Sequence, residues 1–286
     1  MFDWLKQLLR RLLDWLFGRK PPVPVTSRLL FVEPEQHYLN YGSCALRNTV
    51  AANTKPEYEC RELRGSDANP DKINAAIAEI DPALFTGLGH GNECVFTVEC
   101  QTLYMSVKSG SHSKCTRDIN LDKMRGRVVH LVSCVTAVEL GPALIANGAR
   151  AYIGYRDSFW FFTGTTPCGG RDVQSVFLAE FQVEASLMAG LSVGQAYRDS
   201  QARNDQEVEY WTTGEGRNHQ YAAELARILR INKGIQTLLG DADATVCTPT
   251  LSLSFGLTEL ALGMLPLGMV TGIMSLEEAR KQGWMA

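Results

Sequence analysis

The chain has 286 residues, of which 45% are hydrophobic and 21% charged, close to the averages of soluble globular proteins. This length suffices for one large domain with appendages or for two small domains. A single domain of over about 200 residues buries enough apolar surface to fold without metal or disulfide staples. The formal net charge of −3 excludes the strongly basic surface with which proteins bind nucleic acid.

The first predicted element is an amphipathic helix within residues 1–20. Its apolar face is formed by Phe2, Leu5, Leu8, Leu9, Leu12, Leu13 and Leu16. Charged residues interrupt every apolar run, so the segment lacks the apolar centre of a secretory signal. Three prolines end the helix and make residues 21–26 a stiff linker. We expect residues 2–17 either to lie on a membrane surface or to dock on the chain's own domain or a partner protein.

Strand and helix patterns then alternate through residues 27–250. Apolar segments predict five strands, at 28–33, 58–63, 83–89, 127–133 and 149–155. Helical patterns cover 44–54, 69–80, 138–147, 173–208 and 221–231, and residues 94–107 alternate like an antiparallel hairpin. Asn69 and Pro70 form a typical helix start. This order predicts one α/β domain, a mainly parallel sheet flanked by helices in an α/β/α sandwich.

Residues 251–286 are expected to form a separate extension. The apolar stretch 260–274 is broken by Gly263, Pro266, Gly268 and Gly272, and it is too short for a membrane span. Residues 275–282 have the pattern of a short capped helix.

The cysteines are scattered through the chain. They are Cys44, Cys60, Cys94, Cys100, Cys115, Cys134, Cys168 and Cys247, without a CxxC pair or zinc-ligand spacing. We therefore expect no metal and no cofactor. In a chain of this length the pattern predicts mostly buried free thiols, with Cys94 and Cys100 as packing residues, and a cytoplasmic, reducing location. Membrane association through residues 2–17 is the alternative location.

Two reactive side chains follow buried strands directly. His90 stands between Gly89 and Gly91 after one strand, and Cys134 follows Ser133 after another, 44 residues later. The carboxyl ends of parallel strands share one edge of a sheet, where ligands bind. If the two strands are neighbours, the pair meets there, and a helix N-terminus after Cys134 would favour its thiolate. His130 lies within a strand, which favours a hydrogen-bonded place in the core.

An apolar strand ending in His-Gly and a second ending in Ser-Cys resemble the pattern of clan CD cysteine peptidases, which include caspases, legumain, clostripain and separase. Residues 61–92 and 130–155 are similar to the gingipain and CHAT branch, and residues 189–201 and 238–246 resemble later landmarks of that branch. The resemblance covers about residues 27–250 and implies a caspase-like fold. Residues 132–136 read VSCVT, so the caspase pentapeptide is absent, and no acidic residue directly precedes the cysteine. Substrate preference therefore does not carry over.

The resemblance implies a cysteine endopeptidase acting on peptides or proteins. Cys134 would be the nucleophile and His90 the general acid and base, in a Cys-His dyad without a third residue. Backbone N–H groups at Gly91 and Cys134 would form the oxyanion hole. The substrate pocket would include Asp157 and Trp160, with Asp157 as an acidic floor favouring Arg or Lys. Alternatively, Asp157 caps a turn or pairs with Arg156.

Two other classes of function stay open at this point. The chain could be a non-catalytic caspase-like module for assembly or signalling. It could also be a structural subunit of a larger or membrane-associated assembly, held there by its unusual termini.

Overall fold

The computed structural model describes residues 27–35, 39–110, 115–163 and 168–247. The helix expected within residues 1–20, the linker 21–26 and the extension 251–286 lie outside these residues. In the described ranges, no helix combines the length and the hydropathy that crossing a membrane requires.

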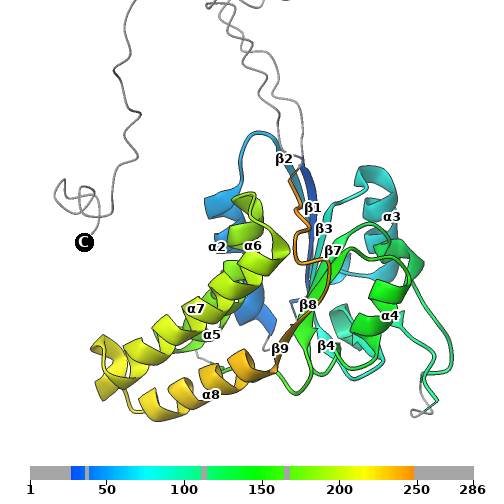
Figure 1. Ribbon diagram of the computed structural model, residues 1–286. Coiled ribbons are helices and arrows are strands. Elements are labelled where there is room, and N and C mark those ends of the chain that lie inside the picture. The colour runs from blue at the N-terminus through cyan, green and yellow to red at the C-terminus, as the bar shows by residue number, and fades with distance from the viewer. Residues whose placement is uncertain (1–26, 36–38, 111–114, 164–167, 248–286) are drawn as a thin grey trace, which may run out of the picture. The chain divides into compact units, whose positions relative to one another are not determined.

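A six-stranded sheet forms the centre of the described domain (Figure 1). Its strands are β1 (Ser27–Glu33), β2 (Tyr58–Arg64), β3 (Leu84–Leu88), β7 (Val128–Val132), β8 (Ala151–Tyr155) and β9 (Gln236–Gly240). Their order across the sheet is β2-β1-β3-β7-β8-β9. The first five run parallel, and β9 pairs antiparallel with β8. The predicted α/β class with a mainly parallel sheet is confirmed.

Helices cover both faces of this sheet (Figure 1). On one face lie α2 (Leu39–Asn53), α5 (Arg171–Glu180), α6 (Gln182–Met188), α7 (Val193–Thr212) and α8 (Ala222–Ile235). On the other lie α3 (Pro70–Ile80) and α4 (Leu140–Ala146). Short 3-10 turns occur at Gly65–Asp67, Glu99–Gln101, Asp122–Met124 and Glu215–Asn218.

The strands contribute side chains to two hydrophobic cores, one on each face of the sheet, because successive side chains of a strand point to opposite faces. In β1, Leu29 and Phe31 face α2 and α5, whereas Leu30 and Val32 face α3. A strand buried on both faces needs apolar residues at every position, and this explains the unbroken apolar runs in the sequence.

A small antiparallel sheet extends the second core. Its strands are β4 (His90–Gly91), β5 (Val95–Thr97) and β6 (Leu103–Ser106), in that order. The predicted hairpin is confirmed in β5 and β6. Strand β4, in which His90 pairs with Thr97, was not predicted.

Most predicted boundaries agree with the structure within a few residues, although α2 begins five residues before the predicted start at Cys44. Two larger differences lie beyond residue 170. The helical pattern over 173–208 is divided into α5, α6 and α7. Gly190, at φ +91°, lies just after the end of α6. Ser192 caps the start of α7, where its side chain accepts a hydrogen bond from the N–H of Gln195 at 3.3 Å. Strand β9 was also not predicted.

The prediction of free thiols is wrong for four of the eight cysteines. Cys44 is disulfide-bonded to Cys168, and Cys94 to Cys115. Cys100, expected to pack inside, lies exposed in the turn after β5. The spacing of these cysteines along the chain did not indicate pairs that the fold brings together. Disulfides persist mainly in oxidising compartments, so these two pairs remove the ground for the expected reducing, cytoplasmic location.

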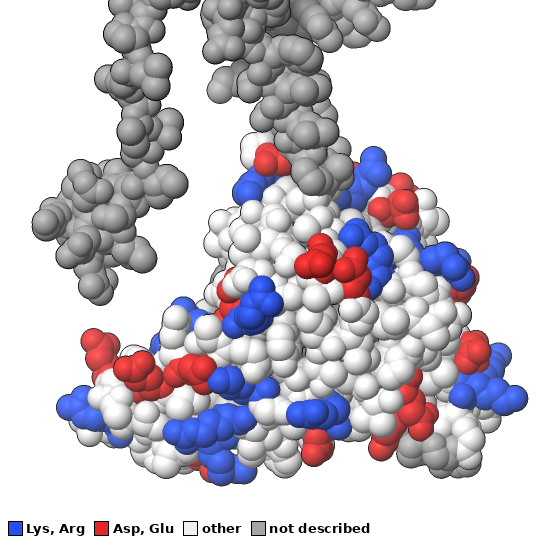
Figure 2. All heavy atoms as spheres, viewed as in Figure 1, with Lys and Arg blue, Asp and Glu red and all other residues white. Residues whose placement is uncertain are grey.

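Acidic and basic side chains are interspersed over the described surface drawn in Figure 2, without a large area of one sign. This even distribution agrees with a net charge close to zero.

Candidate active site

The strands that precede His90 and Cys134 are neighbours in the sheet. β3 and β7 pair in parallel, with Leu88 opposite Val132, and the N–H of Gly89 donates to the carbonyl oxygen of Val132 at 3.3 Å. His90 and Cys134 each lie two residues beyond this last matched pair. The two side chains therefore leave the sheet at the same edge.

Both side chains line one pocket at that edge, and both are half-buried. The empty volume of the pocket is about 350 Å³, part of which is open to solvent. Two residues 44 positions apart in sequence are thus brought together where a bound peptide could contact both. The expectation that the two side chains share one edge of the sheet is met.

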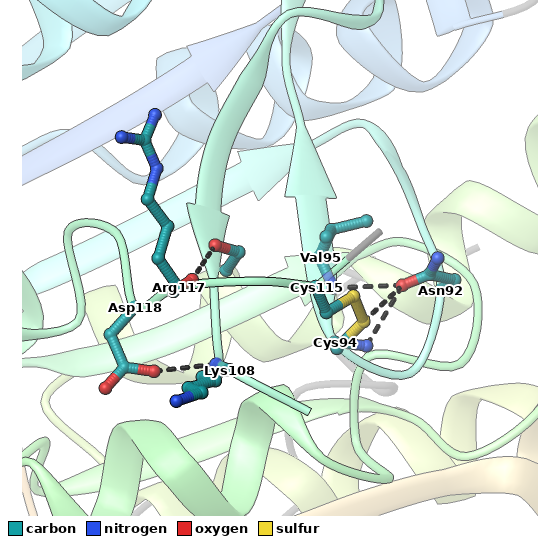
Figure 3. Close-up of a disulfide and its surroundings, with 8 residues drawn as sticks. Asn92, Cys94, Val95, Lys108, Cys115, Arg117 and Asp118 are labelled. Carbon is teal, nitrogen blue, oxygen red and sulfur yellow. Dashed lines mark hydrogen bonds between the residues drawn. A yellow bond between two sulfur atoms is a disulfide. The ribbon is translucent and has the colours of Figure 1, made fainter. Parts of the chain in front are cut away.

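The loop that follows His90 is held by local bonds (Figure 3). The hydroxyl of Thr97 donates to the carbonyl oxygen of His90 at 3.3 Å. The side-chain oxygen of Asn92 accepts the N–H groups of Cys94 and Val95, both at 3.0 Å, in an Asx turn. The disulfide from Cys94 to Cys115 then ties this loop to the chain beyond β6.

The residue after Cys134 has an unusual backbone conformation. Val135 adopts φ +64°, a region that β-branched residues almost never occupy. Two hydrogen bonds hold it there, from the N–H of Val135 to the Asp157 carbonyl at 3.1 Å and from the N–H of Ala137 to the Tyr155 carbonyl at 2.8 Å. Such strain persists only where surrounding structure enforces it, and it clusters at functional sites. Here it turns the chain sharply just after the candidate nucleophile.

The expected helix N-terminus does not lie at Cys134. Turns occupy the intervening residues, and α4 begins only at Leu140. The N–H groups of Glu139 and Leu140 donate to the Glu93 carbonyl, at 3.1 and 2.8 Å. The start of α4 therefore binds the loop of His90 instead of polarising the thiol, and the predicted contribution of the helix to Cys134 is wrong.

Gly91 is where the loops of His90 and Cys134 touch. A Cβ atom at Gly91 would lie 2.6 Å from Cγ2 of Thr136 and closer still to Oγ of Ser133. Only glycine allows this approach. The N–H of Cys134 donates to no acceptor in the described ranges. This group is available for the oxyanion role expected from the sequence, whereas Gly91 lies in the β4 ladder opposite Phe96.

The two residues expected in the substrate pocket do not line the pocket of His90 and Cys134. Asp157 is exposed, and its carboxylate accepts the N–H of the next residue, Ser158, at 2.7 Å. The Trp160 side chain is 52% exposed. Neither is among the described residues that line the pocket of His90 and Cys134.

Asn232 is a residue that the sequence did not indicate. Its side chain accepts the N–H of Trp160 at 3.0 Å and donates to the Trp160 carbonyl at 2.6 Å. Asn232 is 3% exposed and belongs to α8, so it fixes the loop after β8 from a distance of 72 residues in sequence. An asparagine in a helical pattern gives no local signal of such a role.

His130 occupies a buried polar cluster, as its place within a strand predicted. Its ring nitrogens lie 2.6 Å from Glu184 and 2.9 Å from Glu180, and Glu184 also accepts the Thr86 hydroxyl at 2.7 Å. Burial alone would lower the pKa of His130, but the charge of Glu184 and hydrogen bonds to both carboxylates outweigh it and raise the pKa to about 10. His130 is thus a charged core residue and does not line the pocket.

Comparison with known proteins adds no identification. No protein-family model matches the chain, and no curated protein is significantly similar to it.

Proposed function

We propose that the chain is a cysteine endopeptidase that hydrolyses peptide bonds through Cys134 and His90. The observation that carries this proposal is their meeting in one pocket, at the carboxyl ends of the adjacent parallel strands β3 and β7. The enforced conformation of Val135 and the contact of Gly91 with the Cys134 loop support it, because both restrict how the two side chains are presented.

The reaction follows from the roles of the two side chains. Cys134, as thiolate, attacks the carbonyl carbon of the scissile bond and forms a tetrahedral intermediate, whose oxyanion the N–H group of Cys134 stabilises. His90 gives a proton to the departing amine, which leaves a thioester on Cys134. His90 then takes a proton from water, which attacks the thioester and releases the acid and the thiolate.

We further propose that the chain belongs to the caspase-like peptidases of the gingipain and CHAT kind. The strand order that puts β3 beside β7 supports this, since it gives the His-Gly and Ser-Cys motifs the common edge that the resemblance requires. Helices on both faces of the sheet are compatible with an α/β/α sandwich.

Replacement of the nucleophile tests the proposal. Cys134→Ala should abolish turnover of a mixed peptide library, while its circular dichroism and unfolding midpoint match the parent protein. Cys60→Ala is the matched control, because Cys60 is another half-buried thiol, on β2 and outside the pocket. Peptidase activity that survives in Cys134→Ala would overturn the assignment. A parent protein inert towards both peptides and electrophilic peptide ketones would instead favour a non-catalytic module.

A further inference from the structure

The pocket beside His90 and Cys134 has apolar walls. These are formed by Leu39, Leu88, Val132, Phe159, Phe161 and Phe177. No Asp, Glu, Lys or Arg is among the described residues that line it. All six wall residues belong to or pack on the larger hydrophobic core, so the pocket is a recess of that core that opens at the candidate dyad.

The aromatic wall is formed in advance. The ring centroids of Phe161 and Phe177 are 5.3 Å apart, and those of Phe159 and Phe161 are 6.1 Å apart. Phe159 also packs on Tyr155 at 4.7 Å. Rings that hold one another in this way keep their rotamers when a ligand arrives, which lowers the entropic cost of binding.

The pocket lies directly beside the sulfur of Cys134. The Cys134 sulfur is 4.0 Å from the carbonyl oxygen of Phe159 in the aromatic wall. In the acyl-enzyme, the carbon bonded to this sulfur is directly attached to the Cα atom of that substrate residue. Its side chain is therefore the part of the substrate closest to the pocket.

We propose that the enzyme cleaves after apolar residues such as Leu, Met and Phe. This inference rests on the proposed peptidase function and deepens it. The empty volume of about 350 Å³ includes space open to solvent, so the pocket is a small recess that a substrate side chain would enter from the side of the dyad. An apolar side chain gains by leaving water there, whereas a carboxylate or guanidinium would lose its hydration without meeting a counter-ion. The acidic floor expected at Asp157 is absent from this wall.

Peptide substrates that differ only in the residue before the scissile bond test this proposal. We expect kcat/KM for substrates with Leu, Met or Phe at this position to exceed that for substrates with Arg, Lys, Asp or Asn at least about tenfold. The reason is that an apolar pocket offers no partner to a charged or amide side chain. The purified full chain is used, with Cys134→Ala as the blank.

Two adjacent phenylalanines provide matched variants. Phe161 lines the pocket, whereas Phe162 packs against Tyr221 with tilted rings 5.7 Å apart and is not among the described residues that line it. Phe161→Ala should enlarge the pocket and raise the ratio of kcat/KM for Phe over Leu substrates by about fivefold or more, and Phe162→Ala should leave this ratio unchanged. The ratio is measured on one enzyme sample, so it does not depend on how much of the variant is folded.

The outcomes separate the two proposals. A preference for Arg, Lys, Asp or Asn that disappears in Cys134→Ala would overturn the apolar specificity and leave the peptidase function standing. An unchanged ratio in Phe161→Ala would also overturn the specificity. If no substrate is cleaved and Cys134 reacts with neither Leu- nor Arg-bearing peptidyl acyloxymethyl ketones, the peptidase function fails and this inference fails with it.

Discussion

Gly91 joins the two halves of the candidate site. It stands beside His90 in β4, and its Cα hydrogens face Ser133 and Thr136 in the loop of Cys134. The sequence showed the glycine but not its neighbour, because the contact joins segments over 40 residues apart. A substitution there tests whether the spacing of the two loops controls catalysis.

Gly91→Ala should lower kcat/KM by about 10- to 100-fold, because its Cβ atom pushes the His90 loop away from Cys134 and displaces the reacting groups. Peptide hydrolysis measures this, and thermal unfolding shows whether enough folded protein remains. Gly234→Ala is the control, since a Cβ there meets no atom within 4 Å. Equal activity in Gly91→Ala and Gly234→Ala would mean that the loop contact does not position the pair.

His130 has a structural role at the same scale. Its raised pKa means that folding favours its protonated form, and burial also raises the pKa of Glu180, which lies against it. A group whose pKa rises on folding stabilises the fold fully at pH values below its unfolded pKa, which is 6.5 for histidine. This stabilisation is lost as the pH rises towards the folded pKa. The cluster therefore stabilises the protein at acidic and neutral pH and less so in alkali.

We expect the free energy of unfolding to fall as the pH is raised from about 6.5 to about 10, the range between the two pKa values of His130. His130→Ala should cost about 3–5 kcal/mol near pH 6.5, because it leaves two buried carboxylates without their partner. Urea unfolding at several pH values measures both effects. A parent protein and variant that lose stability equally between these pH values would show that His130 does not carry the dependence.

At the scale of elements, the strands were predictable and the packing of distant elements was not. The unbroken apolar runs of β3 and β7 follow from burial on both faces, and Asn69 caps α3 as expected, accepting the Lys72 N–H at 3.1 Å. β9 was missed because a short edge strand after a helix has no distinct pattern of its own. Within residues 173–208 the break between α6 and α7 lies at Gly190, whose positive φ is visible only in the structure.

The loop after β8 is the element on which the substrate pocket depends, and Asn232 of α8 holds it. Asn232→Ala removes both hydrogen bonds to the backbone of Trp160 and should loosen the wall formed by Phe159 and Phe161. We expect a loss of about 1–3 kcal/mol of stability, from two buried polar groups left unpaired. The discrimination between Leu and Arg substrates should fall several-fold.

Asn232→Asp provides a graded comparison, because it keeps the acceptor for the Trp160 N–H and loses the donor to the Trp160 carbonyl. Discrimination should lie between that of the parent protein and that of Asn232→Ala. If Asn232→Ala loses stability while its substrate discrimination stays that of the parent protein, the loop does not shape the pocket.

At the scale of the whole molecule, the cysteines show what the sequence could not supply. The sequence shows directly that the chain has no CxxC motif. Disulfide pairing, by contrast, depends on which Cα atoms the fold brings within about 7 Å of each other. Cys44 on α2 and Cys168 before α5 are 124 residues apart in sequence, with Cα atoms 5.6 Å apart in space. Both elements contribute to the pocket, through Leu39 and Phe177.

The two disulfides lead to a prediction about reductants. In the denatured, unreduced protein, four thiols should react with a thiol reagent, those of Cys60, Cys100, Cys134 and Cys247, and all eight should react after reduction. Cross-links that close loops of 21 and 124 residues reduce the entropy of the unfolded chain, by about 3 and about 5 kcal/mol respectively in the chain-entropy account. The unfolding midpoint should therefore fall in strong reductant.

Activity should respond to reductant in two phases, because the thiol of Cys134 must be reduced whereas one disulfide holds the His90 loop and the other joins two segments next to the pocket walls. Weak reductant removes oxidation from Cys134 and should raise peptide hydrolysis, and strong reductant should lower it again as the loops are released. The double variant Cys94→Ala with Cys115→Ala should be less active than the parent protein before strong reductant is added. Its activity should also decline less in strong reductant, because the disulfide that holds the His90 loop is already absent. Hydrolysis that rises steadily to the strongest reductant, or eight reactive thiols without reduction, would contradict a disulfide-held site.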